Sequence, residues 1–307
     1  MESVLITGSS GFVGTALTQR FLEQGLRVTG VGTSPRHPLI DDSEQFTWIS
    51  ADTSLPGNWQ QAASDADVVI NLAGRNIFKY WTRRYKKAIR ESRIETTRNL
   101  VSAISAADTR AFISASAVGL YGDCGDNDIT ESRKPGSSFL ARVCIDWENQ
   151  AMAAEGKDIP TALLRFGVVL GSSGGALSKM MPAFRFFAGG PLGNGQQWFP
   201  WIHLADLIRA VQFIIQPEGQ GSSPLQGTFN LTSPDLVRHK AFARALGQAL
   251  GRPSFMPAPA WVIRTLMGEL GSALLESQKA RPDALLRAGF AFKYERLASA
   301  LSQAVNP

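Results

Sequence analysis

Three glycines near the start of the chain have the spacing of a phosphate-binding turn. Gly8, Gly11 and Gly14 follow a short apolar run and precede a stretch with apolar residues at helical spacing. Glycine at such positions permits a tight turn, close approach of the backbone to a pyrophosphate, and close packing of a helix on a strand. The helix then offers free N–H groups to the phosphates. Because the motif lies between a predicted strand and a predicted helix, it predicts a dinucleotide site rather than a merely structural turn.

The end of the second predicted strand indicates which dinucleotide binds. NAD sites usually carry an acidic residue there for the ribose 2′-hydroxyl, whereas NADP sites carry an arginine. The segment 32–37 has no acid but contains Ser34, which can hydrogen-bond to a 2′-phosphate, and Arg36, which can pair with it. We therefore expect NADP(H). The alternative is that Arg36 is a solvated loop cation.

The composition excludes several classes of protein. Of the 307 residues, 44% are hydrophobic and only 19% are charged, which excludes a largely disordered chain. The formal net charge of +5 is mild at this length, so it allows an anionic small ligand without requiring nucleic acid. Two cysteines and three scattered histidines do not suit a disulfide scaffold or a metal site. We expect no metal and no nucleic-acid partner.

The sequence also gives expectations about location. No apolar run reaches the length of about 18 residues that a membrane span needs. The first ten residues lack the charged start and the long apolar stretch of a signal peptide. We expect a cytoplasmic protein without a membrane partner.

Strands and helices alternate through the first half of the chain, which is typical of a doubly wound parallel α/β sheet, the Rossmann architecture. After Gly167 the sequence becomes rich in glycine loops, at 171–175 and 189–195, with a surface loop expected at 217–225. We predict a Rossmann core over 1–167 and a smaller mixed substrate lobe over 168–307, interleaved as one continuous fold. The predicted strands are 4–7, 27–32, 46–50, 67–72, 110–114 and 160–166, and the predicted helices include 15–22, 82–107 and 138–155.

These features together resemble the extended short-chain dehydrogenase/reductases, which bind NAD(P). The resemblance rests on the glycine loop, on Asp52 and Thr53 after the third strand, on 71–74 after the fourth, and on 114–122 after the fifth. Within that family the chain is similar to an atypical group called the epimerase family, or sugar nucleotide epimerase-related, some of whose members are described as cell-division inhibitors. Further matching segments are 81–98, 164–177 and 201–206.

The resemblance implies positions for the parts of the cofactor. Asp52 is expected beside the adenine, Leu72 to Gly74 under the adenosine ribose, and Phe166 to Val168 at the nicotinamide. The full set of residues expected to bind the cofactor is Gly8, Ser10, Gly11, Phe12, Val13, Gly14, Ser34, Arg36, Asp52, Thr53, Leu72, Ala73, Gly74, Arg93, Phe166, Gly167 and Val168.

The resemblance also implies a catalytic trio that this sequence does not complete. In the family a serine orients the substrate oxygen, a tyrosine transfers the proton, and a lysine four residues later lowers the pKa of the tyrosine. Ser116 matches the serine. Phe139 and Val143 stand at the tyrosine and lysine positions, and neither can transfer a proton. The usual proton relay is therefore absent.

Several residues are candidates for the missing chemistry. Tyr121 lies near Ser116 and is the second catalytic candidate, although it also fits a loop-packing role. Cys144 is expected to be a buried, inert thiol. Arg93 stands where many relatives have an asparagine, and both a cofactor contact and a helix-face position remain open. Lys86 and Lys87 are expected on a solvated helix face, although their segment could also face phosphates.

The second lobe supplies further polar and aromatic residues. Trp198 and Trp201 could stack on a ligand or lie in the core. His203 could serve in acid–base chemistry, but its sequence context favours a structural helix start with a neighbour such as Asp206. The glycine-rich segment 189–195 is flexible enough to close over a ligand.

Two functions remain open at this point. The first is an NADP(H)-dependent oxidoreductase or epimerase that acts on a polar, nucleotide-sugar-like substrate in the cleft between the lobes. The second is a non-catalytic NADP(H)-binding regulator or sensor, linked to cell division. A scaffold that binds nothing conflicts with the intact glycine motif. Both a monomer and a homodimer are compatible with the sequence.

Overall fold

The computed structural model describes residues 1–172, 174–217 and 223–305. Its first three elements are β1 (Ser3–Thr7), α1 (Phe12–Glu23) and β2 (Arg27–Gly32), and β1 pairs with β2 in parallel. The apolar side chains of β1 are buried on both faces, as expected for a strand covered by helices on each side. This is the predicted βαβ unit.

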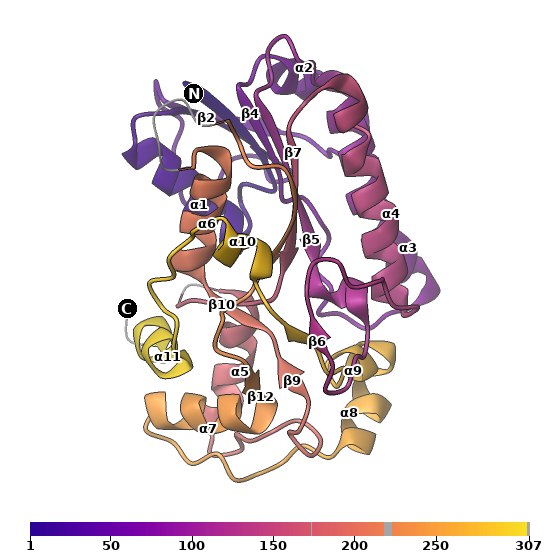
Figure 1. Cartoon of the computed structure of the whole chain (residues 1–307), viewed down its shortest axis with the longest axis vertical. Helices are drawn as coiled ribbons and strands as arrows, with labels where there is room; N and C mark the ends of the chain where they lie inside the picture. The colour runs from indigo at the N-terminus through magenta and orange to yellow at the C-terminus, as the bar shows by residue number, and fades with distance from the viewer. Residues whose placement is uncertain (173, 218–222, 306–307) are drawn as a thin grey trace.

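In the described residues, seven parallel strands form the central sheet in the order β11-β7-β5-β4-β1-β2-β3 (Figure 1). The strand order reverses between β1 and β4, so a crevice is expected outside the carboxyl ends of these strands. This confirms the predicted doubly wound α/β fold. The remaining strands of the sheet are β3 (Phe46–Ser50), β4 (Val68–Asn71), β5 (Ala111–Ala117), β7 (Thr161–Phe166) and β11 (Gly227–Leu231).

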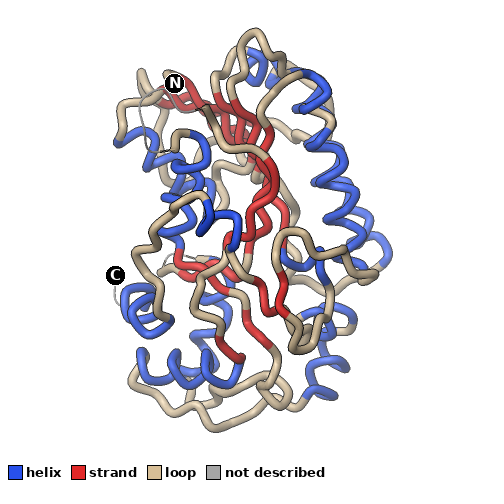
Figure 2. Tube along the Cα trace, viewed as in Figure 1, coloured by secondary structure: helices blue, strands red, loops and turns tan. Residues whose placement is uncertain are grey.

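Helices cover both faces of the sheet, which makes three layers (Figure 2). On one face, α2 (Trp59–Ser64), α3 (Arg83–Ala103) and α4 (Phe139–Met152) bury an apolar core that includes Leu100. On the other face, α1 and α6 (Leu204–Ile215) bury a second core. The sheet is therefore held rigid from both sides, and its carboxyl edge can position side chains.

The second lobe lies beyond the carboxyl ends of the strands, in the lower half of Figure 1. It has its own apolar core, which includes Leu177, Trp201, Phe242 and Leu301. Its elements are β8 (Val168–Leu170), α5 (Gly175–Arg185), β9 (Trp198–Phe199), β10 (Trp201–His203), β12 (Val237–Arg238), α7 (His239–Ala249), α8 (Ala260–Met267), α9 (Glu269–Ala273) and α11 (Leu297–Val305). Short connecting elements are η1 (Val118–Tyr121), β6 (Asp128–Ile129), η2 (Glu155–Lys157), β13 (Lys279–Ala280) and α10 (Asp283–Arg287).

Residues beyond Gly167 also return to the first lobe. The strand β11 forms the edge of the central sheet beside β7, and α6 covers one face of that sheet. The two lobes therefore share one sheet. Of the predicted loop 217–225, residues 218–222 lie outside the described part of the chain, as does residue 173 of the predicted glycine loop 171–175.

Two predicted helices end earlier than expected. The helix α3 stops at Ala103 because Ile104 has an extended conformation, and a turn that joins Thr109 to Ser105 follows. The helix α4 stops at Met152, and the short η2 replaces its predicted last turn.

Candidate functional site

The glycine loop follows β1 at the carboxyl edge of the sheet and leads into α1. Gly8 has a φ of +71°, and a Cβ atom there would lie 2.9 Å from the Leu72 carbonyl. A Cβ at Gly14 would collide with the Gly8 carbonyl oxygen. The amino end of α1 has Gly11 as its N-cap and no side-chain cap, so the first amides of the helix remain available to phosphate.

The loop after β2 contains a polar atom without a partner. Ser34 Oγ is buried and has no hydrogen-bond partner among the described residues. A buried hydroxyl without a partner costs free energy, which a hydrogen-bonding group placed beside it would recover. Arg36, two residues later, is exposed and forms no salt bridge within the described ranges.

Two residues that the sequence analysis missed hold this loop in place. The indole Nε1 of Trp48 in β3 donates to the Ser34 carbonyl at 3.0 Å. The buried His37 ring accepts backbone N–H groups of Leu39 and Ile40 at Nδ1, so its Nε2 carries the proton and donates to the Ser9 carbonyl at 3.2 Å. His37 therefore ties the loop after β2 to the glycine loop. In the sequence, His37 directly follows Arg36, and this position was the signal that could have indicated its role in holding the loop.

The residues expected around the adenosine follow the carboxyl ends of β3 and β4, which lie on either side of β1 and β2 in the sheet. Asp52 is exposed, and its carboxylate accepts from the Ser54 backbone amide at 3.0 Å. Thr53 is buried and shares a hydrogen bond with Thr96 of α3 at 2.9 Å. The contact of Gly8 with Leu72 places the segment after β4 directly against the glycine loop. The structure thus places 72–74 against the glycine loop and joins Thr53 to α3, and the adenosine contacts of these residues stay a prediction.

Arg93 of α3 lies against this same segment. A Cβ at Gly74 would be 2.9 Å from the Arg93 Cζ atom, so the guanidinium lies directly on this glycine. The guanidinium donates to the Ile89 and Arg75 carbonyls and stacks on the Trp147 ring at 5.2 Å. Burial lowers the pKa of Arg93 below its usual value. Because no described carboxylate pairs with it, this guanidinium is available to an anion.

The nicotinamide side of the expected site lies where the two lobes join. The residues Phe166, Gly167 and Val168 end β7 and begin β8, and the Gly167 amide donates to the Leu231 carbonyl of β11 at 3.1 Å. A Cβ at Gly167 would lie 2.9 Å from the Pro200 carbonyl oxygen. The backbone segments that join the two lobes therefore lie in close contact at Gly167.

The remaining residues of the expected cofactor set border the glycine loop. The Phe12 ring packs on Gly174 and Gly175 of the second lobe, where Cβ atoms would come within 2.9 Å of it. Ser10 Oγ lies 3.1 Å from the position that a Cβ on Gly32 would take, and Val13 packs against the core beneath α1. The second lobe thus reaches the phosphate-binding loop.

The positions of the family's tyrosine and lysine are filled by apolar packing. Val143 is buried with Leu270 of α9, and Phe139 packs edge-on against Trp81 with ring centroids 5.2 Å apart. Lys86 Nζ lies 4.6 Å above the Phe139 ring and pairs with Glu269 at 2.7 Å. Lys86 is therefore bound to α9, whereas Lys87 makes only an exposed pair with Glu91 within α3.

A chain of buried polar side chains runs below this apolar cluster. Ser116 Oγ donates to Glu148 Oε1 at 2.6 Å, and Glu148 forms a two-fold pair with Arg165, at 2.9 Å to Nε and 2.8 Å to Nη2. Arg165 Nη1 donates to the Tyr121 hydroxyl at 2.8 Å, which in turn donates to Asn230 Oδ1 at 2.7 Å. The chain joins β5, α4, β7, η1 and β11.

This polar chain determines what Ser116 and Tyr121 can do. The Ser116 proton is committed to a carboxylate, so the serine oxygen can only accept a hydrogen bond from a ligand. Burial raises the pKa of Tyr121 to about 12, and both hydrogen-bonding functions of its phenol are used within the protein. Burial lowers the pKa of Arg165, but the Glu148 carboxylate outweighs this and raises it above the usual value.

The sequence predicted only part of this chain of polar side chains. Ser116 and Tyr121 were singled out, but Glu148, Arg165 and Asn230 were not. An arginine within the apolar strand 160–166 was a usable signal, because a charged group in a buried strand needs a partner. Cys144 behaves as expected: burial raises the pKa of its thiol to about 11, which leaves it neutral.

The second lobe uses most of its candidate residues for structure. Trp201 lies in the core, whereas the Trp198 ring is partly exposed between Arg238 and Lys279. His203 accepts the Ala205 amide at Nδ1 and so caps α6, as the favoured interpretation predicted. Its Nε2 bonds Gln303 at 2.7 Å rather than Asp206, whose carboxylate instead accepts backbone amides.

The glycine-rich segment 189–195 is joined to its surroundings by backbone hydrogen bonds. The Gly193 amide donates to the Ala258 carbonyl at 2.8 Å, and the Lys240 amide donates to the Gly195 carbonyl at 2.9 Å. If the segment 189–195 closes over a ligand, the residues bonded to it must therefore move with it, or these hydrogen bonds must break.

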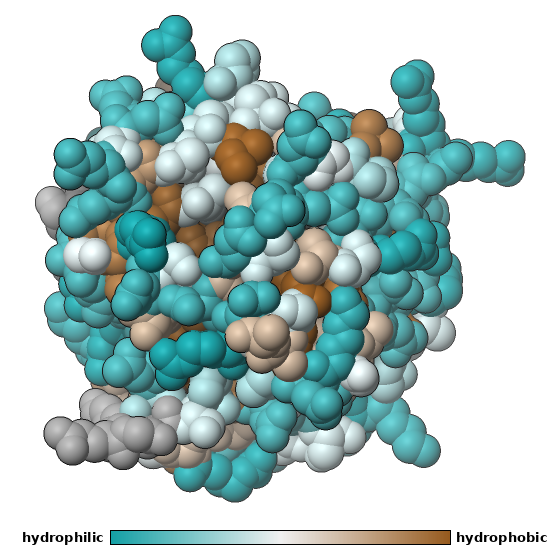
Figure 3. Space-filling view, turned by 90° about the horizontal axis from the view of Figure 1, so that it is seen from above, coloured by the Kyte–Doolittle hydropathy of each residue, from teal (hydrophilic) through white to brown (hydrophobic). Residues whose placement is uncertain are grey.

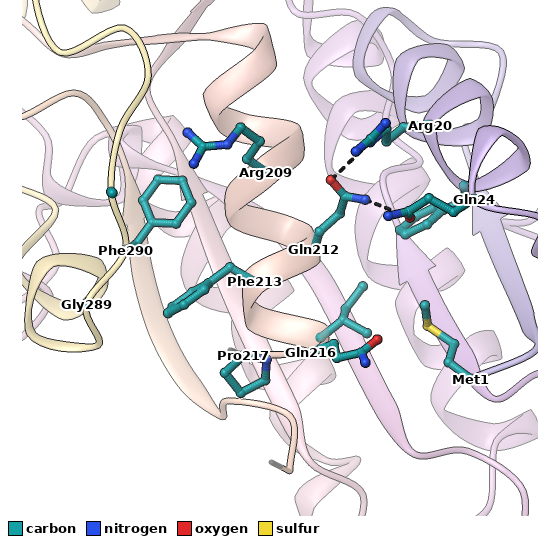
Figure 4. Close-up of a pocket in the computed structure, with 13 residues that line it drawn as sticks. Met1, Arg20, Gln24, Arg209, Gln212, Phe213, Gln216, Pro217, Gly289 and Phe290 are labelled. Carbon is teal, nitrogen blue, oxygen red and sulfur yellow. Dashed lines mark hydrogen bonds between the residues drawn. The ribbon is translucent and has the colours of Figure 1, made fainter. Parts of the chain in front are cut away.

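A large open hollow of about 940 Å³ lies at the other end of the sheet (Figure 4). Its walls come from α1, from α6 and from the turn after α10, and Gln212 bonds both Arg20 and Gln24 across it. Met1, at the start of β1, also lines it. The hollow contains none of the expected site residues, so we do not assign the cofactor to it.

Two further properties concern the described residues as a whole. They contain no group of three or more His, Cys, Asp or Glu side chains that could hold a metal ion. Within the same residues, no helix is both long enough and apolar enough to cross a membrane.

The sheet, the glycine loop and the switch point define a dinucleotide-binding α/β protein. Comparison with known proteins gives the family: the NAD dependent epimerase/dehydratase family matches residues 4–231, and a domain of unknown function, DUF1731, matches residues 258–304. The chain therefore belongs to the NAD dependent epimerase/dehydratase family.

Individual relatives agree with this placement. The chain is 37% identical over 305 residues to the chloroplastic epimerase family protein SDR39U1 homolog of Arabidopsis thaliana, covering 97% of this chain and 85% of that protein. It is 36% identical to the epimerase family protein ML0860 of Mycobacterium leprae, with 99% and 95% covered. The crystal structure of human epimerase family protein SDR39U1 with NADPH superposes with a TM-score of 0.84, at 30% identity and 99% coverage of both chains.

Proposed function

We propose that this protein binds NADP(H) in the crevice at the carboxyl edge of the sheet. The observation that carries the proposal is the buried Ser34 hydroxyl without a partner, next to the unpaired Arg36. A 2′-phosphate would satisfy both groups, whereas the 2′-hydroxyl of NAD(H) would leave the arginine unpaired. The human relative crystallised with NADPH supports this choice.

The residues around the crevice fit the rest of the cofactor. The loop from Gly8 to Gly14 would hold the pyrophosphate at the amino end of α1. Asp52 would accept the adenine amine, and 72–74 would pass under the adenosine ribose. Arg93 would meet an anionic or hydroxyl group of the cofactor, with 166–168 beside the nicotinamide.

We further propose an oxidoreductase or epimerase reaction on a polar, nucleotide-sugar-like substrate. When bound, NADP(H) supplies the hydride chemistry. Ser116 would accept a hydrogen bond from a substrate hydroxyl, and its own proton already lies on the path to Glu148. Tyr121 is the second catalytic candidate, but it must release Asn230 or Arg165 to reach a substrate.

A second function is favoured by a specific observation. Phe139 and Val143 are built into an apolar cluster with α9, so the family's proton relay has been replaced by packing. A non-catalytic NADP(H)-binding regulator or sensor, linked to cell division, would have this arrangement. Its signal would pass through the contact between α4 and α9.

Titration with both cofactors tests the binding proposal. We expect NADPH to bind more tightly than NADH in calorimetry. The double variant Ser34→Ala with Arg36→Ala should weaken NADPH binding by roughly a hundredfold or more, since each of its two charge-assisted contacts contributes about 1.5–3 kcal/mol. NADH affinity should not change. A wild-type preference for NADH would contradict the proposal.

Turnover separates the two functions. NADPH oxidation would be followed against carbonyl compounds and nucleotide sugars, and NADP⁺ reduction against the corresponding alcohols. Tight NADPH binding without turnover across this panel would favour the regulator. If turnover is found, Ser116→Ala should abolish it, and unchanged turnover would remove Ser116 from the mechanism.

A further inference from the structure

Two stretches of the second lobe have an unusual charge composition. Residues 171–205 and 236–268 contain no Asp or Glu, although the whole chain has 26 such residues. With a formal net charge of +5 for the chain, the remainder of the protein is net negative. Their basic residues are Lys179, Arg185, Arg238, Lys240, Arg244, Arg252 and Arg264.

Six of these seven cations are exposed and unpaired. Arg238 forms a salt bridge with Asp126, but none of the other six pairs with a carboxylate in the part of the chain that the structure describes. Elsewhere, arginines such as Arg90 and Arg165 have carboxylate partners. The six cations therefore leave an uncompensated positive charge on this lobe.

The same two stretches expose large apolar side chains. Phe186 is 82% exposed, Phe255 71%, Trp261 70% and Leu266 71%, and Phe187 and Met256 are also exposed. Phe187 has a φ of +60°, at a position after α5 where glycine is usual. A bulky aromatic residue is thus kept in an unfavourable backbone conformation while its ring points largely into solvent.

The two stretches lie side by side. The Met256 amide donates to the Gly189 carbonyl at 3.2 Å, and the Arg252 guanidinium lies 5.0 Å above the Phe187 ring. The segment from 252 to 258 runs along the lower end of the molecule in Figure 1, from α7 to α8. We call this the basic apolar surface: Arg185, Phe186, Phe187, Arg252, Phe255, Met256, Trp261, Arg264 and Leu266.

The opposite end of the molecule has a different character. Seen from above, it is covered mainly by hydrophilic side chains, with apolar atoms recessed between them (Figure 3). Exposed large apolar side chains also occur elsewhere, such as Leu39 and Leu55, but six of the eleven in the described residues lie in the two stretches.

We propose that the basic apolar surface binds the surface of an anionic lipid bilayer. Cationic side chains are attracted to anionic headgroups, while aromatic and aliphatic side chains insert at the boundary of headgroups and acyl chains. The apolar residues protrude as two short pairs, Phe186 with Phe187 and Phe255 with Met256, and as the single residues Trp261 and Leu266 of α8. A fluid bilayer accommodates such protrusions without a complementary shape. This is attachment to one face of a bilayer and requires no spanning helix.

Vesicle sedimentation tests the proposal with the full-length protein. We expect it to sediment with vesicles of phosphatidylcholine containing about 30% phosphatidylglycerol and to stay in solution with phosphatidylcholine alone. Raising the salt from 50 to 500 mM should release most of it, because the headgroup attraction is screened.

Two double variants and one control make the test specific. Phe186→Ser with Phe255→Ser removes exposed apolar groups, and Arg252→Glu with Arg264→Glu reverses charge. The charge reversal should reduce the vesicle-binding constant at least tenfold, as about 1 kcal/mol per basic residue implies for two residues. The apolar variant should also reduce it, because less apolar surface is then buried in the bilayer. The control, Leu286→Ser with Arg287→Glu in α10, changes the same residue types away from the surface and should bind as the wild type does. Thermal melting and NADPH binding report on folding of every variant.

Three outcomes would overturn the proposal. The first is no sedimentation with anionic vesicles at 50 mM salt. The second is equal loss in the control variant. The third is binding to immobilised poly-glutamate, lost in the two surface variants, without binding to vesicles, because the surface would then recognise an acidic protein.

Discussion

Glu276 shows how one residue of the second lobe can make stability depend on pH. It follows α9, close to the segment 123–125 that Ser277 joins through backbone and side-chain hydrogen bonds. Within the described residues, its carboxyl accepts a hydrogen bond only from the side-chain amide of Gln278, at 3.3 Å. Burial and the nearby Asp123 carboxylate raise the pKa of Glu276 to about 7.

The sign of the effect follows from linkage. The unfolded chain loses this proton near pH 4.5, whereas the folded protein keeps it until about pH 7, so stability declines as the pH rises through that window. One pKa unit corresponds to about 1.4 kcal/mol, and solvent screening reduces the total to roughly 1–2 kcal/mol. In urea unfolding at pH 5 and pH 8, Glu276→Gln should remove this decline, and the exposed Glu44→Gln should retain it. A wild-type stability that does not fall in this window would contradict the assignment.

The buried polar chain around Ser116 shows why the hydrogen-bond partners of a site residue cannot be predicted from that residue alone. Ser116 and Tyr121 were predicted together from their place after the fifth strand. Glu148, Arg165 and Asn230 come from three other elements, and their side chains meet only when the sheet is assembled. Residue type and spacing therefore indicated two members of this buried polar chain, but not the three partners that fix the direction of their hydrogen bonds.

At the scale of elements, α4 contacts α9 through the two positions where the family pattern has a tyrosine and a lysine, 139 and 143. Val143 is buried among apolar side chains, and Phe139 is partly exposed beside them. Val143→Lys would place an ammonium there without a carboxylate partner, which we expect to cost about 3–5 kcal/mol. Phe139→Tyr adds only a hydroxyl at a partly exposed ring and should cost less than about 1 kcal/mol.

Urea unfolding of the two variants measures this difference. If Val143→Lys with Phe139→Tyr were as stable as the wild type and gained NADPH-dependent turnover, the apolar cluster would be a recent loss of function that the fold tolerates. A large loss of stability confined to Val143→Lys would show that α9 has been fitted to this helix.

Element boundaries were predictable where local signals decide them. The strands 27–32 and 46–50 were predicted to the residue, because short β-branched and aromatic runs bounded by polar residues specify them. The predicted helix starts at Thr82 and Ser138 are the N-caps, whose side chains accept the Tyr85 and Ala141 amides. The short elements of the second lobe depend on packing against the sheet, which periodicity does not encode.

At the scale of the whole molecule, the lobes depend on each other through β11. This strand covers the edge of β7 and brings Asn230 to the hydroxyl of Tyr121. Glu131 adds a second tie, because its carboxylate accepts the amides of Asn230 and of Ala284 at the start of α10. Residues of the second lobe thus complete the sheet and the buried polar chain of the first.

The predicted core 1–167 should therefore not fold by itself. Without β11, β7 would become the edge of the sheet with unpaired backbone N–H and C=O groups, and Tyr121 would lose a buried partner at a cost of about 1–3 kcal/mol. We expect the full chain to unfold in one cooperative transition in calorimetry. The fragment 1–167 should aggregate or show no cooperative transition, and NADPH should not rescue it. A soluble fragment that binds NADPH as the full chain does would show that the glycine loop and its sheet are independent of the second lobe, and that β11 is only an added edge.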